Sequence, residues 1–218
     1  MSTDVKICGL TRAEDVALAI EHGAAFLGFI VEAASKRRLS VQQVVDISAP
    51  AKGITPRVAV TVNANDDLLA RIMDDMSPEF IQCHGEETPA RVAEISRAFK
   101  VGTIKAVGIA HDSDMKSAEE YVDVCNFILY DAKPPLDSTG KRSDVRGGHG
   151  LSIDWGLIGR SPRPKTFALA GGLHSGNVAR AISQTRAPIV DVSSGVESAA
   201  GIKDKAKIHA FMKAVQHD

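Results

Sequence analysis

The sequence lacks the features that mark several large classes of protein. Its three cysteines, Cys8, Cys83 and Cys125, are widely spaced and form no CxxC pair, so they indicate neither a disulfide framework nor a cysteine-rich zinc site. The histidines and carboxylates show no HExxH or comparable spacing, so no metal is expected. No apolar run approaches the roughly 20 residues that span a bilayer, and no basic segment precedes an apolar one near the start. These absences lead us to expect a cytoplasmic protein.

An excess of charge of one sign is also missing. The formal net charge is −1, so the chain has no general attraction to nucleic acid or to a membrane surface, and neither is expected as a partner. An anionic ligand must therefore be held by a local arrangement of groups. With 218 residues, of which 44% are hydrophobic, the chain can bury a proper core.

What the sequence does have is a regular alternation of short apolar runs with segments of helical periodicity. The runs predict eight strands, near residues 5–8, 26–30, 57–62, 79–83, 102–107, 126–131, 166–170 and 188–192. Polar and glycine residues follow many of these strands, whereas an open doubly wound sheet has one dominant glycine-rich loop. A single α/β domain spanning residues 1–218 and folded as a (β/α)8 barrel explains the pattern better, because its loops share one site.

Some helix starts carry capping signals. Thr88 before Pro89 predicts an N-cap with proline at the first helical position. Hydroxyl residues followed three positions later by Glu or Gln predict capping boxes, at Thr11 with Glu14, Ser40 with Gln43 and Ser194 with Glu197.

The stretch from Asp131 to Ile153 shows no helical or strand period. Loops of this length in a compact domain are usually functional or disordered. Because it directly follows a strand that ends in a carboxylate, we expect a lid loop at about residues 132–152.

Cys8 and Asp131 end the first and sixth predicted strands, so a barrel would bring them to the same face. A thiol and a carboxyl suit a reaction in which one group removes a proton and the other donates one. Cys8 is equally compatible with a small buried core residue, whereas Asp131 favours a site residue over a helix cap. Strand alternation places Cys83 opposite Gln82 and His84, toward the surrounding helices.

The last third of the chain is typical of an anion-binding site. Gly171-Gly172 follows the seventh predicted strand, and Ser194-Gly195 follows the eighth. Barrels often bind phosphate between these two loops. Arg37, after the second strand, can bind a carboxylate with two hydrogen bonds, but the residues alone favour a solvated basic run at a helix start. His84 can be a base, a hydrogen-bonding group for the substrate or a core residue.

Together these segments resemble the phosphoribosylanthranilate isomerase family of tryptophan biosynthesis over nearly the whole chain. The motifs that carry the resemblance are Lys6-Ile7-Cys8-Gly9-Leu10-Thr11, Ser35-Lys36-Arg37, Gln82-Cys83-His84-Gly85-Glu86, Leu129-Tyr130-Asp131, the 147–150 glycine loop with Asp154-Trp155, Gly171-Gly172-Leu173 with Asn177, and Asp191-Val192-Ser193-Ser194-Gly195-Val196-Glu197 with Gly201-Ile202-Lys203-Asp204.

The resemblance implies an Amadori rearrangement of N-(5-phosphoribosyl)anthranilate to 1-(2-carboxyphenylamino)-1-deoxyribulose 5-phosphate, with no cofactor. Asp131 would be the general acid, Cys8 the general base, and Arg37 the ligand of the anthranilate carboxylate. The remaining substrate-binding residues would be Gln82, His84, Gly148, Gly150, Gly171, Gly172, Asn177, Ser194 and Gly195. The chain would act as a monomer or homodimer.

Two alternatives remain at this point. Another phosphate-binding barrel, such as the histidine-pathway aldose–ketose isomerase, resembles a pattern with aspartate as the first-strand base, where this chain has Cys8. A catalytically inactive barrel that binds a phosphate ligand would be expected to lack the acid or the base, and both are present.

Overall fold

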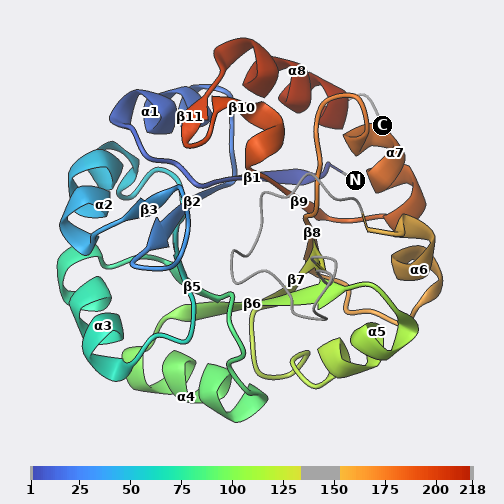
Figure 1. Ribbon diagram of the computed structural model, residues 1–218, viewed down its shortest axis with the longest axis horizontal. Coiled ribbons are helices and arrows are strands. Elements are labelled where there is room, and N and C mark those ends of the chain that lie inside the picture. The colour runs from blue at the N-terminus through green and yellow to red at the C-terminus, as the bar shows by residue number, and fades with distance from the viewer. Residues whose placement is uncertain (1, 134–152, 217–218) are drawn as a thin grey trace, which may run out of the picture.

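The computed structural model describes residues 2–133 and 153–216 and shows a closed barrel of eight parallel strands inside a ring of helices (Figure 1). The first strand pairs in parallel with both the second and the last, which closes the sheet on itself. The barrel strands are β1 (Asp4–Cys8), β2 (Phe26–Val31), β4 (Arg57–Thr61), β5 (Phe80–Cys83), β6 (Gly102–Ile109), β7 (Phe127–Ala132), β8 (Phe167–Leu169) and β9 (Ile189–Val192). All eight predicted strands are confirmed, with ends that differ by at most two residues.

Helices connect the strands and cover the outside of the barrel (Figure 1). They are α1 (Ala13–Glu21), α2 (Val41–Ser48), α3 (Asp66–Arg71), α4 (Pro89–Phe99), α5 (Asp112–Glu119), α6 (Trp155–Arg160), α7 (Val178–Thr185) and α8 (Lys205–Gln216). Short additions are β3 (Arg38–Leu39), beside β2, the pair β10 (Glu197–Ala199) and β11 (Ile202–Lys203), and the helical turns η1 (Ala49–Ala51), η2 (Ile72–Met76) and η3 (Ser194–Val196).

Strand alternation divides the core into two clusters. One cluster fills the inside of the barrel and includes Cys8, Val60 and Leu129. The other lies between strands and helices and includes Ile7 and Cys83, each of which follows or precedes an inward-facing residue. The prediction that Cys83 faces the helices is therefore confirmed.

The helix caps agree only in part with the sequence signals. Ser40 and Gln43 form the predicted capping box, and the Thr88 hydroxyl accepts from the backbone N–H of Arg91. The box predicted at Thr11 is wrong, because Arg12 is the N-cap of α1 and the Thr11 hydroxyl instead donates to the Gly201 carbonyl. The box predicted at Ser194 is also wrong, because the Glu197 carboxylate binds Arg37. In both cases the side chain bonds a group that is distant in the sequence instead of capping the helix.

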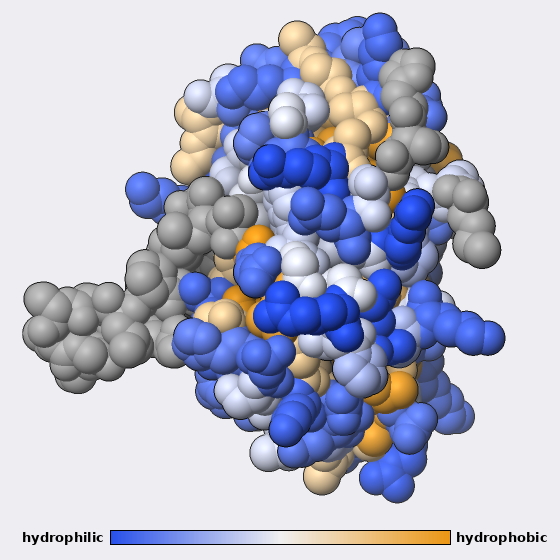
Figure 2. All heavy atoms as spheres, turned by 90° about the vertical axis from the view of Figure 1, so that its right-hand side faces the viewer, coloured by the Kyte–Doolittle hydropathy of each residue, from blue (hydrophilic) through white to orange (hydrophobic). Residues whose placement is uncertain are grey.

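The predicted lid at 132–152 lies outside the described residues except for its first two positions. Across the described part of the chain, every helix is too short or too polar to cross a membrane. The face of the molecule over α6 and α7 carries mostly hydrophilic residues, with hydrophobic ones in small separate areas (Figure 2). The helices on this side thus turn polar surface outward and keep apolar side chains such as Trp155 and Ile182 against the barrel.

Three phenylalanines close the end of the barrel where the strands begin. Phe26, Phe80 and Phe127 are the first residues of β2, β5 and β7, and their ring centroids lie 5.8 to 6.0 Å apart. Aromatic pairs at such separations add to the hydrophobic stabilisation from burial. This aromatic cluster fills the barrel at the end opposite to the carboxyl ends of the strands.

We expect Phe127→Ala to lower the free energy of unfolding by about 3–5 kcal/mol, because it removes a buried ring that two neighbours contact. Urea titration followed by circular dichroism measures this change. Val122→Ala, at a residue with 37% of its surface exposed, is the control and should cost no more than about 0.5 kcal/mol. Equal effects of the two substitutions would contradict a stabilising role for the aromatic cluster.

Candidate active site

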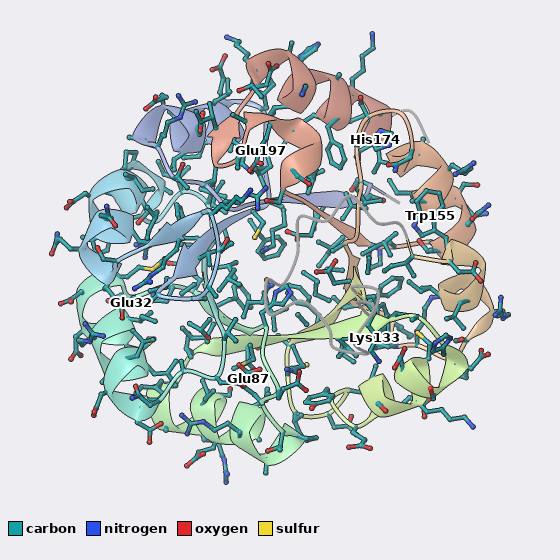
Figure 3. All side chains as sticks on the ribbon, in the orientation of Figure 1. Glu32, Glu87, Lys133, Trp155, His174 and Glu197 are labelled. Carbon is teal, nitrogen blue, oxygen red and sulfur yellow. The ribbon has the colours of Figure 1, made fainter. Side chains whose placement is uncertain are left out.

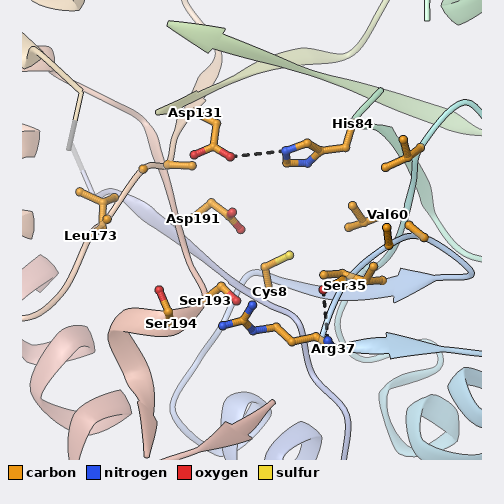
Figure 4. Close-up of a pocket in the computed structure, with 17 residues that line it drawn as sticks. Cys8, Ser35, Arg37, Val60, His84, Asp131, Leu173, Asp191, Ser193 and Ser194 are labelled. Carbon is orange, nitrogen blue, oxygen red and sulfur yellow. Dashed lines mark hydrogen bonds and ion pairs between the residues drawn. The ribbon is translucent and has the colours of Figure 1, made fainter. Parts of the chain in front are cut away.

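An open cavity lies at the carboxyl ends of the barrel strands and is lined from both ends of the sequence (Figure 4). Its lining includes a thiol, two carboxylates, a guanidinium and an imidazole. The lining residues are Cys8, Ile30, Ala33, Ala34, Ser35, Arg37, Val60, Val62, His84, Asp131, Ala170, Gly171, Gly172, Leu173, Asp191, Ser193 and Ser194. Cys8 and Asp131, 123 positions apart in the sequence, therefore open onto the same cavity.

Cys8 is the last residue of β1, and its side chain points into the barrel. The neighbouring residue across the sheet is Gly28, where an added Cβ would lie 2.8 Å from the sulfur, so the thiol fits only because this position has no side chain. Burial raises the pKa of the Cys8 thiol, and the nearby ammonium groups of Lys6 and Lys203 oppose that rise without cancelling it.

Asp131 lies one residue before the end of β7, on the inward face of the strand. One carboxylate oxygen, Oδ1, accepts from the backbone N–H of Ala132, and the other, Oδ2, is 3.4 Å from Nε2 of His84 (Figure 4). On its other side, Nδ1 of His84 lies 2.8 Å from Nε2 of Gln82. The ring of His84 therefore lies between the Gln82 amide and the Asp131 carboxylate, with one ring nitrogen facing each.

Arg37 is fixed by a buried carboxylate. Its Nε and Nη2 each bond Glu197 at 2.7 Å, and within the described residues its Nη1 makes no hydrogen bond. Gly9 has a φ of +72°, and a Cβ there would lie 2.4 Å from Cδ of Arg37, so glycine is required for this guanidinium to pass. Hydrogen bonds to Glu197 raise the pKa of Arg37, which keeps the cation charged at the edge of the cavity.

Lys203 joins this pair from β11 and is itself fully buried. Its ammonium donates to Glu197, to the carbonyl of Ser193 and to the carbonyl of Cys8. Burial alone would raise the pKa of Glu197, but Arg37 and Lys203 outweigh it and hold the pKa below its ordinary value. The Arg37–Glu197–Lys203 cluster thus connects the segment before β3 with β10 and β11. Figure 3 shows Glu197 between β1 and α8.

The loops after β8 and β9 form the side of the cavity rich in small residues. Gly171 and Gly172 have φ values of +85° and +68°, in the left-handed region that favours glycine. The loop is braced by Asn177, which donates to the Gly172 carbonyl and accepts from the His174 N–H. A Cβ on Gly195 would lie 1.9 Å from the Leu173 carbonyl oxygen, so the two loops touch through backbone atoms. Backbone packed this closely can offer N–H groups to an anion.

The predicted site residues separate into three groups. The structure brings Cys8, Arg37, His84, Asp131, Gly171, Gly172 and Ser194 to the cavity wall. It places Gln82, Asn177 and Gly195 behind that wall, where they support His84 and the two glycine loops. Gly148 and Gly150 lie outside the described residues.

Sequence reasoning missed three charged residues, Asp191, Glu197 and Lys203. The position of Asp191 carried a usable signal, because it lies two residues after the inward-facing Ile189 on the last strand. Lys203 belongs to the Gly201-Ile202-Lys203-Asp204 motif, but nothing in the sequence shows that it reaches the carbonyl of Cys8, 195 positions away. Among the described residues, no group of three or more His, Cys, Asp or Glu side chains is placed to hold a metal ion.

Comparison with known proteins agrees with this geometry. The family model of N-(5′-phosphoribosyl)anthranilate (PRA) isomerase matches residues 5–214. N-(5′-phosphoribosyl)anthranilate isomerase of Rhizobium meliloti is 40% identical over 216 residues, which are 99% of this chain and 98% of that protein. The crystal structure of phosphoribosylanthranilate isomerase from Thermotoga maritima superposes with a TM-score of 0.85 at 34% identity, and 98% of each chain is covered.

A closed (β/α)8 barrel whose strand ends gather a thiol, two carboxylates and a guanidinium around one cavity defines a barrel enzyme that acts on a small molecule. Within that class the family is shown by both sequence and structure. The chain belongs to the phosphoribosylanthranilate isomerase family. It is an aldose–ketose isomerase of tryptophan biosynthesis.

We expect Glu197→Gln to lower the free energy of unfolding by on the order of 3 kcal/mol at pH 7, because it leaves the buried Lys203 and Arg37 without a countercharge. The difference from wild type should shrink on acidification. Between the lowered pKa of folded Glu197 and about 4.3, the unfolded chain binds more protons, so wild-type stability falls as the pH falls.

Urea titrations at pH 7 and at pH 4 measure both effects. Glu94→Gln is the control, since Glu94 pairs with Arg91 at the surface and its loss should cost about 0.5 kcal/mol or less. A penalty for Glu197→Gln that is the same at both pH values would contradict the assignment of the stabilisation to the charged carboxylate.

Proposed function

We propose that this chain converts N-(5-phosphoribosyl)anthranilate to 1-(2-carboxyphenylamino)-1-deoxyribulose 5-phosphate, with Asp131 as general acid and Cys8 as general base. The observation that supports this most is that the two side chains face one cavity from opposite sides of the barrel (Figure 4). A relative from the same family, 32% identical with a TM-score of 0.82, is described in complex with the reduced form of this product.

The first step is ring opening. Asp131 donates a proton to the ring oxygen of the ribose, the bond between that oxygen and C1′ breaks, and the nitrogen lone pair forms a Schiff base with C1′. The half-buried position of Asp131 and the ring of His84 beside it hold the carboxyl toward the cavity. We infer that His84 and Gln82 keep this carboxyl oriented while its proton leaves.

The second step is proton removal. Cys8, as thiolate, takes the proton from C2′, and the electrons of that bond form the C1′–C2′ double bond of an enolamine, which tautomerises to the ketone. Because burial raises the pKa of the thiol, deprotonation depends on the cations around it.

The two ends of the substrate need separate anchors. Arg37 would bind the anthranilate carboxylate through its Nη1, since Glu197 occupies its Nε and Nη2. The backbone at Gly171, Gly172, Ser194 and Gly195 would bind the phosphate, with Asn177 bracing the first of these loops. Binding energy at the phosphate would then hold C2′ in place beside Cys8.

The domain limits and the cellular setting rest on the sequence. We propose a single domain over residues 1–218, with residues 132–152 as a lid that contributes Gly148 and Gly150. We also propose a cytoplasmic enzyme that acts as a monomer or homodimer; a Thermotoga maritima relative at 32% identity is described as generated monomers of a dimeric enzyme.

The direct test is a fluorescence assay of phosphoribosylanthranilate consumption by the purified chain. We expect turnover with this substrate and none with the histidine-pathway aldose, because Cys8 stands at the end of the first strand. Turnover of the histidine-pathway substrate alone would overturn the proposal.

We expect Cys8→Ser and Asp131→Asn each to reduce kcat by about 10²–10⁴-fold, the usual contribution of a positioned acid or base. Binding of a product analogue, measured by calorimetry, should be retained because neither change removes an anchor. Near-normal kcat in either variant would remove the role assigned to that residue.

For Arg37→Ala we expect a rise in KM of at least tenfold with some loss of kcat, because the carboxylate anchor is lost. Arg38→Ala is the matched control, since Arg38 is the next residue and is exposed to solvent. Steady-state kinetics on both variants provide the comparison, and equal KM values would place Arg37 outside the substrate site.

A further inference from the structure

Lys6 is a fully buried lysine inside the barrel that the proposed function does not use. It lies on β1 two residues before Cys8, so both side chains point to the interior. It does not line the cavity, whereas Cys8 and Asp191 do. Lys6 therefore lies one layer below the residues that substrate would touch.

The geometry places the Lys6 ammonium against the sulfur. A single added Cβ on Gly28 would lie 2.8 Å from Sγ of Cys8 and 3.0 Å from Nζ of Lys6, so both atoms border the same small space. The absence of a side chain at Gly28 is what lets a long cationic side chain and a thiol share the inside of the barrel.

The charge of Lys6 is balanced by one carboxylate. Nζ is 2.7 Å from Oδ1 of Asp191, which lies beside Lys6 in the register between β1 and β9. Burial would lower the pKa of Lys6, but Asp191 and Cys8 raise it above its ordinary value. Lys6 therefore remains an ammonium with three N–H donors, one of which is directed to Asp191.

A buried ammonium is costly for the fold, because the attraction of one carboxylate seldom repays the loss of hydration. An apolar residue at this position of a barrel would pack without that cost. This unfavourable burial is offset if the ammonium also stabilises a second anion that forms transiently. The thiolate of Cys8 is such an anion.

We propose that Lys6 is a positioning residue that stabilises the thiolate of Cys8 from beneath the active site, with Asp191 balancing its charge when the thiol is protonated. This inference rests on the proposed role of Cys8 as the base. Lys6 favours the thiolate by its positive charge close to the sulfur, and in this way it lowers the pKa of the Cys8 thiol against the effect of burial.

Other charged groups also face Cys8. Lys203 donates to the carbonyl of Cys8 from β11, and Arg37 approaches from the segment before β3. Asp191 opposes the thiolate from β9, while His84 and Asp131 line the same cavity from β5 and β7. A test must therefore separate the effect of Lys6 from that of Asp191.

The experiment measures the pKa of Cys8 without turnover. Iodoacetamide alkylates the thiolate, and peptide mass spectrometry after timed labelling at several pH values reports the rate at Cys8 alone. We expect Lys6→Met to move the labelling profile of Cys8 upward by about 1 pH unit or more, the usual effect of losing a nearby opposite charge. The rising limb of kcat/KM against pH should move with it, with about a tenfold loss at neutral pH.

The double variant Lys6→Met with Asp191→Asn leaves no unpaired charge inside the barrel and so keeps the test open if Lys6→Met alone does not fold. It is compared with Asp191→Asn. If Lys6 acts on the sulfur directly, the labelling profile of the double variant stays above that of Asp191→Asn. If Lys6 only neutralises Asp191, the two profiles coincide and the proposal is overturned.

The matched control removes another buried ion pair. Lys105 is on β6, and its Nζ lies 2.8 Å from Oε2 of Glu87. Figure 3 shows Glu87 across the barrel from Glu197. Lys105→Met with Glu87→Gln should lower stability and leave the labelling profile of Cys8 unchanged. A shift as large as that of Lys6→Met would attribute the effect to general destabilisation and overturn the proposal.

The two proposals fail in different ways. If Cys8→Ser keeps near-normal turnover while Lys6→Met still shifts the labelling profile, Cys8 is not the base and the coupling between Lys6 and the sulfur serves no catalytic step. If Cys8→Ser is inactive but Lys6→Met leaves both profiles in place, Cys8 keeps its role and Lys6 loses the one proposed here.

Discussion

The pairing of β1 with both β9 and β2 is the constraint from which the rest of the site follows. The hydrogen bonds on its two edges close the sheet, and closure turns every second side chain of β1 toward a confined interior. Cys8 and Lys6 are two of those side chains. In an open sheet the same residues would lie on one edge, far from the strand that carries Asp131.

The fold was readable from the sequence because the apolar runs are short, β-branched and separated by helical segments at regular intervals. Each strand, including the run 127–132, needs only its own residues to be recognised. The caps at Ser40 and Thr88 were predictable for the same reason, since both partners lie within one helical turn. Thr11 and Glu197 show the limit of such reasoning. Instead of a local capping partner, Thr11 bonds Gly201, 190 positions away, and Glu197 binds Arg37, 160 positions away.

The candidate site, like the fold, could be predicted from the sequence only in part. The thiol of Cys8, the carboxyl of Asp131 and the paired glycines stand at strand ends, where the barrel fold gives position a meaning. The charged residues that support them could not be recognised from their positions in this way. Lys203 lies in a two-residue strand and supports the site by donating to the carbonyl of Cys8. Only the tertiary structure reveals this contact. Lys6 was visible as part of a motif, but its burial beneath the cavity depends on Gly28, on the strand beside it.

The contact between Lys203 and Cys8 joins residues 195 positions apart, close to the two extremes of the chain. During synthesis the first strand leaves the ribosome long before its second neighbour, β9, or the anchoring ammonium of β11 exists. The nascent polypeptide therefore holds an incomplete sheet with an unpaired edge until β9 emerges. Deletion of the segment from β9 to β11 would open the seam of the barrel and also separate Cys8 from the ammonium of Lys203 that holds its backbone.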